Sequence, residues 1–479
     1  MIIGLMALKV LEGRRRRVAR AALYGSLVLV GGIAWAAVTF IDQPLKASRT
    51  ERWHDRDYLN LPEVKLLQEY ARIDTSETTG DEVAGALFLA RQFQAAGIPT
   101  RLERLGPRKA NLYAWLEGRD PHPLVLHNHI DVSPADPKEW LSPPFAARIE
   151  LPWIYGRGVF DMKSVAIAQM AAMIDLKQSG VPLKRSVLFL ATSSEERGSR
   201  LGVRRLVQLH PGMVRDFWAV LTEGGAVEAR SREDIKYWGT EFAQKRSADL
   251  IVCSDSRERL EDLRRTLREL GPTETDLRLT PETRTFFATY AASRDRADLR
   301  DLVGHPEKAL GDVAAFRKLP PYLQSMLRNE ALPFPVEAAK GGGYQLLIKL
   351  QLLPGEDLAA VREKLVPAWL TFGMVTVLDE PLTARRGSPL DHPVLEEIEA
   401  TLREEYPDAR VGPSFLARTL TDARFFRALG VPAYGFSPFL IMSTDTFQVD
   451  SANERFAIPA FVDGVDLYGR VVRRLVADT

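Results

Sequence analysis

The chain has 479 residues and a formal net charge of +1, because 64 Lys and Arg residues nearly balance 63 Asp and Glu residues. This length exceeds one ordinary domain, and with 46% hydrophobic and 27% charged residues the chain has enough apolar material to build a core, which excludes disorder over most of it. The charge balance argues against nucleic-acid binding, and the single cysteine, Cys253, excludes a disulfide framework and a cysteine-rich zinc site.

An uncharged stretch follows an arginine-rich N-terminus. Five arginines lie within residues 1–20, and residues 21–41 carry no charge. As a helix this stretch would be about 31 Å long, which matches the hydrocarbon core of a bilayer. We therefore expect a basic cytoplasmic tail over 1–20, a transmembrane anchor over 21–41 and a stalk over 42–60, with the rest of the chain exported to a periplasmic, extracellular or lumenal space. The alternative is a cleaved signal peptide and a secreted protein.

Apolar runs alternate with helical patterns between residues 61 and 240. A helical pattern over 61–97 precedes three apolar runs at 124–126, 187–191 and 219–221, and a further helix is expected from 162 to 179. Continuous apolar strands separated by helices predict an α/β domain with a mostly parallel sheet and helices on both of its faces.

The composition changes over residues 241–380, where charged segments flank a weakly alternating run at 346–353. We expect this segment to form a smaller α+β domain inserted into the larger one. Residues 381–479 return to the α/β pattern, with helices expected near 393–406 and 423–429, and complete the larger domain.

Ionisable side chains follow each apolar run or precede the helix between them: His129, Asp131, Asp161, Glu195, Glu196 and Glu223. In a parallel sheet the ligand crevice lies at the carboxyl ends of the strands, so these side chains are expected at one edge. Each acid alone is typical of a solvated loop or a helix cap. Several carboxylates at one edge repel each other unless cations neutralise them, and carboxylates with one imidazole suit Zn²⁺ or a similar metal. The Asp131 carboxylate is expected to accept the other ring N–H of His129.

Several motifs in order carry a resemblance. LVLHNHIDVSPADPKEW, IYGRGVFDMK, VLFLATSSEERGSRLG and LTEGG, followed by TDARFFRALGVPAYGFSPF and NERF, resemble the di-zinc metallopeptidase family of aminoacylase, carboxypeptidase S and glutamate carboxypeptidase. The resemblance covers residues 60–240 and 385–479, which implies a catalytic domain in two parts, 61–240 and 381–479. The insertion at 241–380 takes the place of the family's lid, which often dimerises, so a homodimer through the lid is expected.

The resemblance implies two zinc ions per chain, with a single ion as the alternative. His129 and Glu223 would bind one zinc, Glu196 would bind the other, and Asp161 would bridge both. Glu195 would be the general base that takes a proton from a metal-bound water. The implied reaction is hydrolysis of a peptide or an N-acyl amino acid at an amide bond near a free carboxylate.

The resemblance also implies roles for Arg424 and Asp450, and the chain departs from the family pattern at Asp450 and in the lid. Arg424 would hold the substrate carboxylate. Asp450 stands where the family has its last histidine ligand, and no histidine follows His392, so Asp450 is the candidate ligand. The lid segment 251–256 lacks the family's histidine, a loss that typically costs about a hundred- to a thousandfold in rate, and His305 is the candidate substitute. An active zinc metallohydrolase and a degenerate homologue that serves as a binding or scaffold protein both remain open.

Overall fold

The computed structural model describes residues 57–270, 276–365, 375–379, 384 and 386–478. The predicted tail (1–20) and anchor (21–41) lie outside these residues, as does most of the predicted stalk (42–60). Within the described part of the chain, no helix is both long and apolar enough to cross a membrane.

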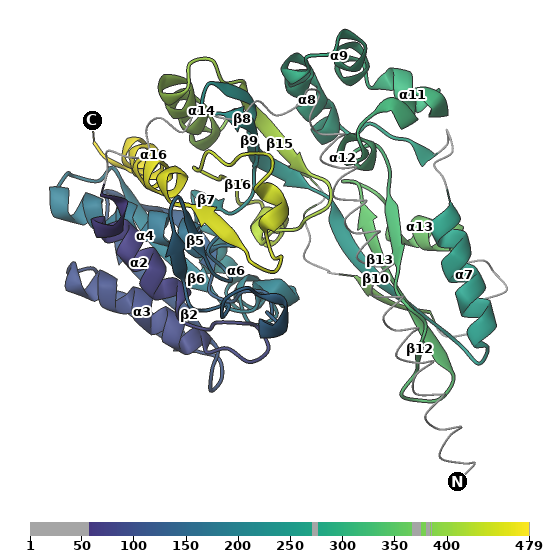
Figure 1. Cartoon of the computed structure of the whole chain (residues 1–479), viewed down its shortest axis with the longest axis horizontal. Helices are drawn as coiled ribbons and strands as arrows, with labels where there is room; N and C mark the ends of the chain where they lie inside the picture. The colour runs from purple at the N-terminus through teal and green to yellow at the C-terminus, as the bar shows by residue number, and fades with distance from the viewer. Residues whose placement is uncertain (1–56, 271–275, 366–374, 380–383, 385, 479) are drawn as a thin grey trace. The chain divides into compact units, whose positions relative to one another are not determined.

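A large mixed sheet forms the centre of the larger domain (Figure 1). Its described strands run in the order β1 (Thr100–Arg104), β2 (Ala110–Leu116), β6 (Arg185–Thr192), β3 (Asp120–His129), β7 (Ala219–Thr222), β16 (Ala433–Gly435), β9 (Asp234–Gln244) and β15 (Val411–Leu416), with β8 (Ala226–Ser231) paired to β9. The central run β6-β3-β7-β16 is parallel, as expected, and so is the β9–β15 pair. Strand β2 pairs with β6 in antiparallel orientation, and β1 pairs antiparallel with β2.

The apolar runs are continuous because both faces of the central strands are covered. Along β3, Leu124 and Leu126 pack into one core, whereas Val125 between them packs into a second core on the opposite face. The first core contains residues of α2 (Pro62–Ala71), α3 (Glu82–Ala95), α4 (Lys163–Ser179), α14 (Pro393–Glu405) and α16 (Ile458–Val476); the second contains residues of α5 (Val203–Leu209), α6 (Pro211–Arg215) and α15 (Ala423–Ala428). Helices therefore cover both faces of the sheet.

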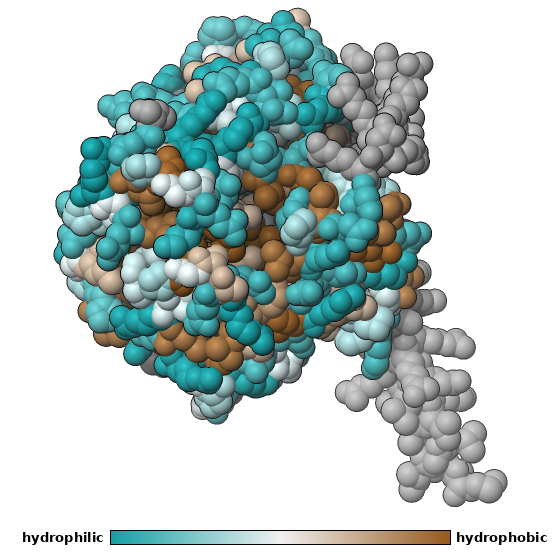
Figure 2. Space-filling model, turned by 90° about the vertical axis from the view of Figure 1, so that its left-hand side faces the viewer, coloured by the Kyte–Doolittle hydropathy of each residue, from teal (hydrophilic) through white to brown (hydrophobic). Residues whose placement is uncertain are grey.

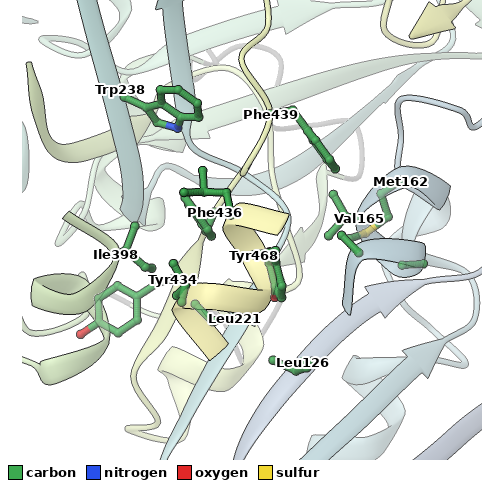
Figure 3. Close-up of a cluster of buried hydrophobic side chains, with 14 of the residues drawn as sticks. Leu126, Met162, Val165, Leu221, Trp238, Ile398, Tyr434, Phe436, Phe439 and Tyr468 are labelled. Carbon is green, nitrogen blue, oxygen red and sulfur yellow. The ribbon is translucent and has the colours of Figure 1, made fainter. Parts of the chain in front are cut away.

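The core beneath α16 is shared by segments from across the chain. Figure 3 shows Leu126 and Leu221 of two neighbouring strands with Tyr468 of α16 and Ile398 of α14. The Tyr468 hydroxyl lies 3.2 Å from the Gln169 amide nitrogen. The C-terminal segment thus completes the core of the larger domain.

On the face that Figure 2 presents, apolar residues lie between hydrophilic ones.

The helical pattern predicted over 61–97 forms two helices, α2 and α3. The break falls at residues 72–81, and the Asp81 side chain caps α3 by accepting a hydrogen bond from the Ala84 N–H at 3.1 Å. A capping aspartate starts a new helix because it satisfies an otherwise unpaired N–H. Helix α4 ends at Gly180, which has a positive φ of 63°.

A second sheet lies within the predicted insertion. Its described strands run in the order β11 (Glu330–Pro333), β13 (Tyr344–Leu352), β10 (Arg246–Ser254) and β14 (Val375–Asp379), with β12 (Glu337–Ala338) also paired to β13. Helix α7 (Arg257–Glu269) buries three leucines against this sheet, and α13 (Leu358–Leu365) adds Leu358 to the same core (Figure 1). We call this sheet with α7 and α13 the lid.

Between the lid segments, residues 281–325 form five short helices that belong to a different core. They are α8 (Pro281–Tyr290), α9 (Ala297–Gly304), α10 (Glu307–Leu310), α11 (Val313–Lys318) and α12 (Pro321–Ser325). Phe286 and Tyr290 pack against Tyr237 of β9, so these helices extend the core of the large sheet. The composition of residues 241–380 did not separate this helical group from the lid.

A small antiparallel sheet positions the last candidate ligand. Its described strands are β17 (Arg455–Ala457), β5 (Trp153–Tyr155) and β4 (Arg148–Glu150), in that order. Because β17 pairs with β5, the loop before β17 lies beside the loop after β5. Asp450 and Asp161 are thereby brought to the same place.

Candidate metal centre

The parallel strands β6, β3 and β7 carry the candidate ligands to one edge. His129 is the last residue of β3, Glu223 follows β7, and Glu195 and Glu196 follow β6. Asp161 lies two residues before the first residue of α4. Because these three neighbouring strands are parallel, their carboxyl ends meet, and the predicted residues converge.

Three of these side chains form the first cluster: His129, Asp161 and Glu223. The His129 Nε2 atom lies 3.0 Å from Asp161 Oδ1 and 3.5 Å from Glu223 Oε2. The imidazole is 1% exposed, and its Nδ1 donates a hydrogen bond to the Asp131 main-chain oxygen at 2.7 Å. That bond directs Nε2 toward the two carboxylates, the orientation that a metal ligand requires.

A second cluster shares Asp161 and adds Glu196 and Asp450. Glu196 Oε2 accepts a hydrogen bond from the Ser133 hydroxyl at 2.7 Å, whereas the buried Oε1 has no hydrogen-bond partner among the described residues. The ligand atoms within each cluster lie within 4.8 Å of one another. Asp161 therefore stands where two cations would share one carboxylate.

The electrostatics of the site agree with bound cations. Burial and the Asp161 carboxylate raise the pKa of both Glu223 and Glu196 to about 8. Burial lowers the pKa of His129, but the Glu223 and Asp161 carboxylates outweigh it and raise this pKa well above its usual value. Carboxylates that cannot all ionise side by side are neutralised by cations. The donor set, with its unpartnered buried oxygen, thus fits two divalent metal ions.

The sequence led us to expect that the Asp131 carboxylate accepts the ring N–H of His129, but the structure shows a different contact. The main-chain oxygen of Asp131 accepts that ring N–H, and the nearer carboxylate oxygen is 3.8 Å from Nδ1. The carboxylate instead accepts the main-chain N–H groups of Glu195 at 3.0 Å and Glu196 at 3.1 Å. Successive main-chain N–H groups in a turn form a concavity that binds an anion. Asp131 therefore fixes the turn that carries the candidate base and a candidate ligand.

Glu195 lies beside Arg424 and interacts electrostatically with Glu223 and His129 of the first cluster. Burial raises its pKa well above the usual value, and the Glu223 and Asp422 carboxylates act in the same direction. The Arg424 guanidinium is 3.7 Å from Glu195 Oε1 and donates a hydrogen bond to the Thr421 main-chain oxygen at 2.6 Å. Arg424 is thus beside the candidate base, where it would meet a substrate that reaches Glu195.

Two buried residues of the site did not stand out in the sequence: Arg157 and Glu454. Arg157 donates to Glu454 Oε2 at 2.6 Å and to the Asp450 main-chain oxygen at 3.0 Å. Glu454 Oε1 accepts the Phe160 N–H at 2.8 Å. Arg157 lies in the motif GRGVFD and Glu454 lies in the motif NERF. Their location in these motifs was the signal that could have drawn attention to them.

The lid supplies no imidazole to the site among the residues described. The segment 251–256 forms the end of β10 and the turn before α7. His305 lies at the C-terminal end of α9, where its Nδ1 is 3.0 Å from the Asp301 main-chain oxygen. It belongs to the helical group that packs on the large sheet, and its ring is engaged by its own helix.

The fold and the paired clusters are those of a metal-dependent hydrolase. The sequence pattern of peptidase family M20/M25/M40 matches residues 125–474 of the chain. The chain belongs to this family.

Similar proteins agree with this assignment. Aminoacylase-1A of Rattus norvegicus is 24% identical over 436 residues, which cover 87% of this chain and 96% of that protein. Probable carboxypeptidase S-like 2 of Dictyostelium discoideum is 22% identical over 476 residues, which cover 88% of this chain and 87% of that protein. The M20 family metallo-carboxypeptidase Sso-CP2 from Sulfolobus solfataricus superposes with a TM-score of 0.65 at 19% identity, over 86% of this chain and 99% of that one. At this identity the structural likeness shows a shared fold.

Proposed function

We propose that the chain hydrolyses an amide bond of a small peptide or an N-acyl amino acid, next to a free carboxylate of the substrate. The observation that carries the proposal is the pair of clusters sharing Asp161, with Glu195 and Arg424 side by side next to the first of them. The names of the relatives, an aminoacylase and a carboxypeptidase S-like protein, support this substrate class.

Each residue has a distinct role in this proposal. His129, Asp161 and Glu223 would hold one metal ion, zinc by the nature of these ligands, and Asp161, Glu196 and Asp450 would hold the other. Bound metal ions lower the pKa of water and polarise a carbonyl oxygen.

Glu195 would take the proton from the attacking water and return it to the amine that leaves. Arg424, whose guanidinium offers paired N–H donors, would bind the substrate carboxylate.

The test is a screen of dipeptides and N-acyl amino acids with the full chain supplied with zinc. We expect turnover by the wild type, loss of turnover in Glu195→Ala, and normal turnover in Glu258→Ala, which removes an exposed carboxylate from lid helix α7. Equal inactivity of wild type and Glu195→Ala, despite bound metal, would refute hydrolysis. Tight binding of a screened compound without turnover would favour the second candidate, a binding or scaffold protein, which the replacement of the histidine by Asp450 and the missing lid histidine support.

We propose further that residues 21–41 anchor the chain in a membrane with the catalytic domain exported, and that two chains pair through the lid. The arginines of residues 1–20 support the orientation, and the family resemblance of the insertion supports the pairing. Sedimentation of the detergent-solubilised chain distinguishes a dimer from a monomer.

A further inference from the structure

The two clusters offer chemically different ligands. The first combines one imidazole nitrogen, His129 Nε2, with two carboxylates. The second consists of carboxylate oxygens alone, from Asp161, Glu196 and Asp450. Ser133, which donates a hydrogen bond to Glu196 Oε2, also offers oxygen. The difference arises at Asp450, which supplies oxygen where the resembling family supplies nitrogen.

Ligand type selects the metal. Imidazole nitrogen suits zinc, whereas sites made only of carboxylate, carbonyl and water oxygens suit Mg²⁺, Ca²⁺ and Mn²⁺. Resting on the proposed function, we propose that the cluster of Asp161, Glu196 and Asp450 takes a hard, oxygen-preferring divalent cation such as Mn²⁺, while the His129 cluster takes zinc. The chain would then hold two different metals that share Asp161.

The surroundings of Asp450 fit such a cation. Its side chain is 40% exposed, so solvent reaches this side of the cluster. Mg²⁺ and Mn²⁺ favour octahedral oxygen coordination, and Mg²⁺ usually keeps several water molecules, which an open side provides.

Arg157 positions Asp450 mainly through its main chain, so the Asp450 carboxylate stays available to a metal ion. Its Nη2 donates to the Asp450 main-chain oxygen at 3.0 Å, whereas its Nη1 is 3.5 Å from Oδ1, the long limit for a hydrogen bond. The backbone of Asp450 is therefore fixed mainly through its own carbonyl oxygen. Glu196 brings a buried carboxylate oxygen without a hydrogen-bond partner among the described residues to the same cluster.

The test is metal content after competition. The full chain, purified in detergent and freed of metal with a chelator, is dialysed against Zn²⁺ with Mn²⁺ in large excess, because a given site binds Zn²⁺ more tightly than Mn²⁺, and both metals are counted by mass spectrometry. Electron paramagnetic resonance reports the environment of bound Mn²⁺. We expect about one zinc and one manganese ion per chain in the wild type, and about two zinc ions in Asp450→His, which restores a nitrogen ligand. Asp450→Asn, which keeps the shape and removes the charge, is expected to lose manganese at least tenfold and to retain zinc.

The outcomes separate this inference from the proposed function. Two zinc ions in both the wild type and Asp450→His would overturn the inference and leave the proposed function intact. One zinc and no second cation in either protein would also overturn it. No metal in any protein would overturn both. Circular dichroism establishes that each variant is folded, and the asparagine variant decides the question if the histidine variant fails to fold.

Discussion

Replacing Arg157 with methionine removes the cation from a buried ion pair next to the metal centre. Arg157 is 3% exposed and Glu454 is fully buried, with 2.6 Å between the guanidinium nitrogen and Oε2. Breaking such a pair from one side costs about 3–5 kcal/mol, because the remaining charge stays buried without its partner. Methionine has a similar length and no charge, so the change isolates the loss of the cation.

The protonation of Glu454 decides how this cost changes with pH. Burial raises the pKa of Glu454 to about 7 although Arg157, the strongest influence that lowers it, is present. Without Arg157 this pKa rises further, because the carboxyl group takes up a proton rather than remain a buried anion. We therefore expect a loss of about 3 kcal/mol at pH 7 from the broken ion pair, and a larger loss above pH 7, where the wild-type carboxylate ionises and that of the variant does not.

The sign of the pH dependence follows from the same argument. The folded variant keeps a proton on Glu454 that the folded wild type releases above about pH 7, so the variant loses further stability relative to the wild type as the pH rises above 7. From pH 7 to pH 9 the loss should grow by about 2 kcal/mol. In the double variant Arg157→Met with Glu454→Gln, which has no carboxyl group to protonate, this pH dependence should disappear.

Urea unfolding of the metal-free full chain at pH 7 and pH 9, followed by tryptophan fluorescence, measures these differences. Metal is left out because binding would add its own stabilisation. The matched control is Arg265→Met, which breaks an exposed ion pair with Asp262 at 2.6 Å, where the side chains are 66% and 55% exposed. That change should stay within about 0.5 kcal/mol. A loss below about 1 kcal/mol for Arg157→Met at pH 7, or equal losses at both pH values, would refute the reasoning.

Three further predictions concern the turn, the substrate and the membrane. Asp131→Asn keeps the shape but weakens the anchoring of the Glu195 and Glu196 N–H groups, so metal affinity should fall roughly ten- to a hundredfold in a chelator titration; unchanged affinity would contradict this role. Arg424→Lys loses the paired N–H donors and should lower kcat/KM roughly ten- to a hundredfold for substrates with a free carboxylate but not for their amides, whereas equal losses on both would exclude carboxylate binding. Removing residues 1–41 should move the chain from the membrane fraction to the supernatant, and a truncated chain that still sediments with membranes would contradict the anchor.

The centre of the fold could be predicted because its signals are local. The runs at 124–126, 187–191 and 219–221 became β3, β6 and β7, since strands covered on both faces need apolar residues at every position. The helical group at 281–325 was not separated from the lid. Its packing on Tyr237 depends on β9, and this distant contact leaves no periodic trace in the helical segment itself.

The candidate ligands could be predicted for a related reason. His129 ends β3, Glu223 directly follows β7, and Glu196 lies in the turn after β6, so the topology of a parallel sheet brings them together. Arg157 and Glu454 are 297 residues apart, and neither follows a strand of the large sheet. Their pairing depends on the β17–β5 contact, which the sequence pattern did not indicate.

Main-chain contacts hold both halves of the second cluster, and this explains how a ligand can change while the site persists. The Asp131 carboxylate binds the N–H groups of Glu195 and Glu196, and the Arg157 guanidinium binds the carbonyl oxygen of Asp450. Neither contact depends on the side chain at position 450. A histidine-to-aspartate exchange there alters which cation the cluster prefers while the loop keeps its anchor. The same anchoring is the reason to expect that Asp450→His folds, so that its metal content reports ligand chemistry and not a collapsed loop.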